Sequence, residues 1–161
     1  MGEVTRVQSG ALSQVSRADR AEIRRLMTVL STDKKEPHIE SAASKLLSLA
    51  GKNAANAILV QDELGQYIRT FTIKYPVSES DYDTRMSRLW HAFHTLADMY
   101  GRAKNLSHGN DQIAQKIKSG CIYVMKYVDS NAKNQYPPQV TAGAHNTLHN
   151  WKVPGYPYLV E

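Results

Sequence analysis

The stretch MSRLWHAFHTLADMY, residues 86–100, decides the fold class of this chain. Its apolar side chains recur at intervals of three and four positions, which is the spacing of one buried side of an α-helix. They are Met86, Leu89, Trp90, Phe93, Leu96, Ala97 and Tyr100. We predict a long helix that is capped by Ser80 and that stops within 101–109, a segment with glycine at each end. Because Trp90 and Phe93 are large and apolar, we expect this helix at the centre of the protein.

The same spacing predicts helices on both sides of this stretch. Ser16 is expected to cap a first helix, and Pro37 suits the first turn of a second. A third helix should run to about Thr70, and Asn110 should cap a last long helix. The apolar positions of these four helices are Ile23, Leu26, Met27, Leu30; Ile39, Ala43, Leu46, Leu47, Ala50; Ala57, Val60, Leu64, Ile68; and Ile113, Ile117, Cys121, Val124, Val128.

These patterns predict an all-α fold, a compact bundle of four to five helices. The bundle should occupy residues 16–133 as one domain, because 161 residues suit a single core. Residues 1–15 are polar and without clear period, and we expect them to form an extended arm. Pro137 and Pro138 stop the last helix, so that 134–161 is expected to be an extended, Pro/Tyr-rich interaction tail that allows one or two helical turns over 141–151.

The composition of this tail is unusual. Four of the six prolines lie in it, with three of the nine tyrosines and Trp151, yet it carries only two formal charges. Disordered tails are usually charged and poor in aromatic residues, so this one should lie on an apolar surface. That surface is either the helical body of the same chain or a neighbouring subunit. We place four tail residues at a subunit interface: Tyr136, Trp151, Tyr156 and Tyr158.

The chain is basic, with a formal net charge of +5 and an isoelectric point near 9.3. The excess of cations lies in the first and last helical regions. Basic surfaces attract phosphate polymers and acidic partners. Arg17, Arg20 and Arg24 share one side of the first predicted helix because they are spaced three and four apart. The ordinary alternative for such a run is a solvated helix side with no ligand.

We predict contacts to nucleic acid from basic residues of the first helix, the loop after it and the last helix. They are Arg17, Arg20, Arg24, Lys34, Lys35, Lys116, Lys118, Lys126 and Lys133. Tyrosines such as Tyr123 and Tyr127 lie among these lysines, and such mixtures bind nucleic acid through charge and stacking. They occur equally at protein–protein interfaces.

Signatures of catalysis are missing from the sequence. It contains no nucleotide-binding glycine loop, no nucleophile elbow and no paired cysteine motif, and Cys121 is the single cysteine. His91, His94 and Asp98 are spaced as metal ligands on one helix could be, which leaves a metal protein or helical enzyme as a minor alternative. The commoner explanation for such histidines is a surface or an interface. We predict no cofactor and no enzyme activity.

The leading hypothesis is a non-catalytic assembly subunit that packs with copies of itself or with other subunits. Its basic helices would contact nucleic-acid backbone without sequence preference, as expected of a helical nucleocapsid or coat-like subunit or of a small helical subunit of a nucleoprotein complex. The main alternative is an accessory subunit of a large protein complex without nucleic acid. The first residues lack the apolar core of a signal peptide, and no apolar run approaches a membrane span. We therefore expect no membrane partner, and a location inside the cell or within a nucleoprotein particle.

Overall fold

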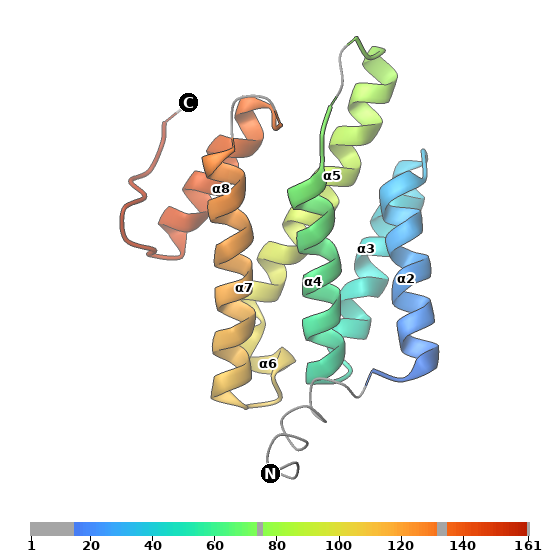
Figure 1. The fold of residues 1–161 in the computed structure, drawn as a ribbon, viewed down its shortest axis with the longest axis vertical. Helices are drawn as coiled ribbons and strands as arrows, with labels where there is room; N and C mark the ends of the chain where they lie inside the picture. The colour runs from blue at the N-terminus through green and yellow to red at the C-terminus, as the bar shows by residue number, and fades with distance from the viewer. Residues whose placement is uncertain (1–14, 74–75, 132–134, 161) are drawn as a thin grey trace.

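The computed structural model describes residues 15–73, 76–131 and 135–160, and in these ranges every regular element is an α-helix (Figure 1). The helices are α2 (Arg17–Thr32), α3 (Glu36–Ala50), α4 (Ala54–Thr70), α5 (Glu79–Gly101), α6 (Ala103–Leu106), α7 (Asp111–Ser130) and α8 (Pro138–Asn150). The all-α prediction is confirmed. The two helices beyond the expected number are the short α6 and α8. No helix in the described residues is long and apolar enough to cross a membrane.

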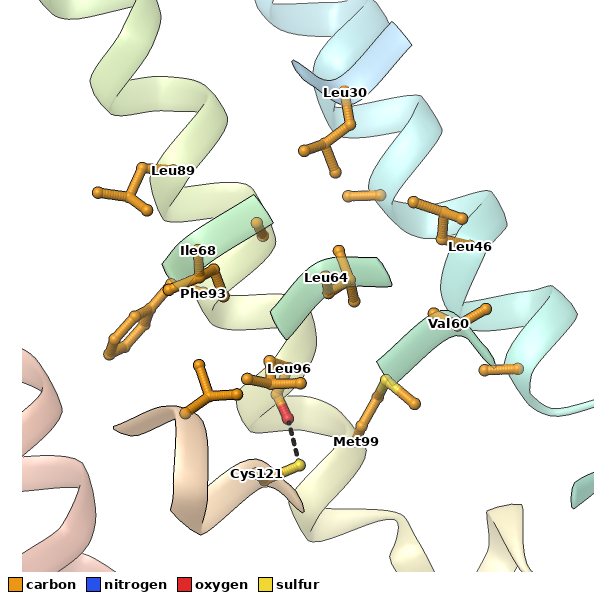
Figure 2. Close-up of a cluster of buried hydrophobic side chains, with 14 of the residues drawn as sticks. Leu30, Leu46, Val60, Leu64, Ile68, Leu89, Phe93, Leu96, Met99 and Cys121 are labelled. Atoms are coloured by element: carbon orange, nitrogen blue, oxygen red, sulfur yellow. Dashed lines mark hydrogen bonds between the residues drawn. The ribbon is translucent and has the colours of Figure 1, made fainter. Parts of the chain in front are cut away.

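Helix α5 lies at the centre, as its sequence predicted. It contacts α2, α3, α4, α6 and α7. Leu89, Leu96 and Met99 are completely buried, and Figure 2 shows them with side chains of α4 in one apolar cluster. The predicted cap was wrong by two residues, because Ser78, rather than Ser80, accepts a hydrogen bond from the backbone N–H of Asp81.

The helices form two layers. Helix α4 lies between α2 and α7 in Figure 1 and contacts both, and α3 and α5 lie behind these three. The caps predicted for α2 and α7 are confirmed, since Ser16 and Asn110 each accept a backbone N–H of the first turn. Because α2, α4 and α7 together form the front layer, their outward sides lie on one face of the molecule.

Two glycines let α4 and α7 approach closely. A Cβ on Gly65 would lie 3.0 Å from a methyl carbon of Val124, and one on Gly120 would lie 2.5 Å from Oε1 of Gln61. The Gln61 amide is buried between the two helices, where its Nε2 donates to the Ile117 carbonyl and contacts Sγ of Cys121. The amide has little freedom to move aside, so Gly120 is required by packing rather than by its backbone angle.

Gly120→Ala should lower the free energy of unfolding by about 1–3 kcal/mol, because the new methyl group displaces a buried, hydrogen-bonded amide. Gly101→Ala is the matched control, since a Cβ there has no heavy atom within 4 Å and alanine favours the helix. Urea denaturation followed by circular dichroism measures both. Equal stability of the two variants would contradict the close packing of α4 on α7.

The C-terminal region differs from the expected extended tail. Residues 138–150 form α8, and Val140, Ala144 and Leu148 are buried in the common core. Proline lacks a backbone N–H, so it cannot continue α7, but it suits the first turn of a new helix. In the described part of this region, residues 135–137 and 151–160 lie outside helices. We call 153–160 the C-terminal strap, and Figure 1 shows it beside α8.

The expected N-terminal arm, residues 1–15, lies outside the described residues except for Val15. Val15 is half-buried and packs against the core.

Candidate nucleic-acid interface

The outward side of α2 carries the predicted arginines. Arg17, Arg20 and Arg24 lie on the flank of α2 that faces α4, because their spacing matches that of Thr28 and Ser31 on the same flank. A surface groove runs between the two helices. It is lined by Arg24, Met27, Thr28 and Ser31 of α2 and by Glu63, Gln66, Tyr67 and Thr70 of α4. The polar lining and the adjacent arginines make this groove suitable for an anionic chain.

A second group of charged and aromatic side chains lies where α4 meets α7. The guanidinium carbon of Arg69 is 5.6 Å from the ring centroid of Tyr123, a cation–π distance. Asp62 is near both Arg69 and Lys116, whose charges act to lower the pKa of its carboxyl group. Partial burial outweighs them, and the pKa of Asp62 is raised.

Together these side chains form a basic surface across three helices, which we call the α2–α4–α7 face. Its basic residues are Arg17, Arg20, Arg24, Arg69, Lys116 and Lys126, with Tyr123 among them. Asp62 and Glu63 of α4 are the carboxylates on its central helix. The cations outnumber these two carboxylates, so the face as a whole attracts negative charge.

The remaining predicted basic residues do not lie on this face. Lys34 and Lys35 are in the α2–α3 connection, beyond the end of α2 opposite to Arg17. The Lys118 amine lies 5.5 Å from the ring centroid of Tyr100 on α5, on the other flank of α7. Lys133 lies outside the described residues. The nine predicted contacts therefore do not form one site.

Arg69 was not among the predicted nucleic-acid contacts, although it lies on the α2–α4–α7 face. It lies at the end of the third predicted helix, away from the basic residues of the first and last helices. Its position seven residues after Asp62 was the available signal, because that spacing places both on one side of a helix.

The tail aromatics contact the same chain. The Tyr136 hydroxyl donates to the Ile68 carbonyl at 2.7 Å, its ring lies parallel to that of Phe71, and burial raises its pKa. Tyr136 is only 4% exposed. Its assignment to a subunit interface is therefore wrong, because apolar surface of its own bundle covers it.

The other three tail aromatics also pack within the chain, but less completely. The Trp151 ring stacks on Tyr100 with centroids 3.7 Å apart, and the Tyr156 ring lies edge to face with His145. Tyr158 contacts His149 but remains 59% exposed. Of the four predicted interface residues, Tyr158 is the one with most of its surface open to a partner.

The histidines of α5 have partners other than metal. His91 Nε2 lies 2.6 Å from a carboxylate oxygen of Glu36 on α3. The His94 ring stacks on Trp90, and burial is the main cause of its lowered pKa. No three His, Cys, Asp or Glu side chains among the described residues come close enough to hold a metal ion. His91, His94 and Asp98 thus form no site in this part of the chain.

Cys121 is buried at the centre of the fold. Its thiol donates to the Leu96 carbonyl at 3.4 Å, the contact drawn in Figure 2. Burial raises the pKa of the thiol to about 12. A thiol of such low acidity is a poor nucleophile near neutral pH, which agrees with its assignment to the core.

Comparison of the chain with protein-family models, with curated proteins and with solved structures finds no match.

Proposed function

We propose that this protein is a non-catalytic assembly subunit that binds the backbone of nucleic acid and self-associates. The observation that carries the proposal is the convergence of basic side chains from α2, α4 and α7 on one face. Phosphate contacts supply most of the affinity of sequence-independent binding, and they need spaced cations rather than a deep pocket.

Several of these cations have no carboxylate bound to them. Arg25 forms a close ion pair with Glu22 on the α3 flank of α2. By contrast, no salt bridge within the described residues involves Arg20, Arg24 or Arg69. An unpaired arginine can donate to phosphate without first breaking an internal bond.

Self-association is assigned to the end of the C-terminal strap. Tyr158, Leu159 and Val160 are consecutive, and they are 59%, 40% and 85% exposed. The strap is held to the body by Val153 and Tyr156, which pack against the core, and by polar contacts to α8, in which Asn146 bonds both backbone groups of Leu159 and His149 contacts the Tyr156 carbonyl. The side chains of Tyr158, Leu159 and Val160 remain available to a second copy of the chain.

The binding part of the proposal is tested by titrating labelled oligonucleotides with purified protein at several salt concentrations. We expect an affinity that falls steeply and linearly on a log–log plot, and that varies little with base sequence. Absent or salt-insensitive binding would favour the accessory subunit that acts without nucleic acid.

Two truncations test the assembly part. Removing residues 158–161, which keeps Tyr156 in place, should leave the melting temperature nearly unchanged but reduce self-association, measured by light scattering and size-exclusion chromatography. Removing residues 138–161 should also lower the melting temperature, because the buried side of α8 is lost. If the shorter truncation leaves assembly intact, the strap is not the contact.

A further inference from the structure

Tyr123 is a large aromatic residue that the fold leaves exposed. Its side chain is 58% exposed. Among the described residues the other exposed large apolar side chains belong to the C-terminal strap, so Tyr123 is the one on the helical body. It lies on the outward side of α7, and its neighbours along that helix are Lys116 and Lys126.

The guanidinium group of Arg69 lies over this ring, and its hydrogen-bond donors are not all used within the described residues. Its guanidinium lies 5.6 Å from the Tyr123 centroid. Its Nε is buried and has no acceptor among the described residues, and none of them forms a salt bridge with it. The contact with Tyr123 therefore positions a planar cation whose terminal nitrogens are not committed to a carboxylate.

Planar groups of this kind bind nucleobases. Aromatic rings and guanidinium planes stack on bases whatever their sequence, and nearby cations bind the phosphates. Lys116, Tyr123 and Lys126 extend along about 15 Å of α7, given a rise of about 1.5 Å per residue. That length accommodates a few nucleotides, so one base could stack while flanking phosphates meet the lysines.

We propose that the Arg69–Tyr123 pair is a stacking site for an unpaired base, so that the polymer bound on the α2–α4–α7 face is single-stranded. A base inside a duplex is already stacked on its neighbours and cannot reach an exposed ring without being extruded. The inference rests on the proposed function, and it adds the strandedness of the ligand.

Tyr123→Ala tests this site, with Tyr82→Ala as the control because that half-buried tyrosine lies on α5, off the face and outside the C-terminal strap. The measurement is the affinity for oligo(dT) and oligo(rU) and for a duplex of the same length at one salt concentration. Tyr123→Ala should weaken single-strand binding by roughly 5- to 100-fold, with little effect on the salt slope. Tyr82→Ala should have no effect on binding, and Tyr123→Phe should bind as the parent does because it keeps the ring.

The outcomes separate this inference from the proposed function. If the protein binds a duplex as tightly as a single strand, or if Tyr123→Ala binds oligo(dT) and oligo(rU) normally, the stacking site is wrong while backbone binding stands. If neither form binds at any salt concentration, both proposals fail. Circular dichroism of Tyr123→Ala checks that loss of binding does not come from loss of fold, and Tyr123→Phe provides the same check through restored binding.

Discussion

Replacing Arg20, Arg24 and Arg69 together by glutamate should weaken nucleic-acid binding by about 100- to 1000-fold near 0.1 M salt. Arg20 and Arg24 come from the α2 side of the groove and Arg69 comes from the α4–α7 junction, so the variant removes charge at separate points of the face. Each lost phosphate contact should also reduce the log–log salt slope by about 0.7–0.9. Fluorescence anisotropy with a labelled oligonucleotide at several salt concentrations measures both quantities.

The control has the same change of charge elsewhere on the surface. Lys34, Lys45 and Arg102 are exposed and lie off the α2–α4–α7 face. Their replacement by glutamate should reduce affinity much less, because only long-range attraction is altered. Equal losses in the two variants would mean that net charge, rather than this face, governs binding.

Phe93→Ala should lower the free energy of unfolding by about 3–5 kcal/mol. Phe93 is 3% exposed, lies on the central helix and packs edge to face against Trp90. Removing its ring leaves a cavity between elements that are packed from several sides, so the site has little freedom to collapse. Chemical denaturation monitored by circular dichroism gives the value.

Tyr158→Ala is the comparison for that measurement, since it removes an aromatic ring from a position that is 59% exposed. A change within about 0.5 kcal/mol is expected there. A loss at Phe93 no larger than the loss at Tyr158 would contradict the central position of α5.

The helices were predictable because their signals are local. Spacing of three and four residues located the buried sides of α2, α3, α4, α5 and α7, and side-chain caps such as Ser16 and Asn110 marked two of the starts. The end of α4 near Thr70 was also predicted correctly. The exact cap of α5 was not, because Ser78 and Ser80 are equivalent as residue types and only the backbone path distinguishes them.

Helix α8 was predicted only as one or two turns over 141–151, because its sequence signals oppose one another. Pro137 and Pro138 suggested an extended tail, and Gly143 weakens a helical pattern. In the fold Val140, Ala144 and Leu148 are buried against the bundle, and a Cβ at Gly143 would lie 3.5 Å from the ring of Trp90. Tertiary packing outweighs the low propensity of this segment, as it does for many helices.

The candidate face was predictable only in part. The charge of α2 and α7 could be read from the chain, but Arg69 acquires its relevance from Tyr123, which is more than fifty residues away. Lys118 is the opposite case. Its place among the lysines of the last helix suggested a contact to nucleic acid, but its amine lies near the ring of Tyr100.

By itself, then, the sequence determined that this protein is a bundle of helices, and where most of them begin and end, because helix period and caps depend on neighbours within a few positions. The tertiary structure decided which aromatic residues are covered by the chain itself and which cations share a face. Both depend on side chains from separate helices meeting in space: Tyr136 reaches the end of α4, and Arg69 reaches Tyr123. No local pattern encodes such meetings, since they follow from how complete helices pack on one another.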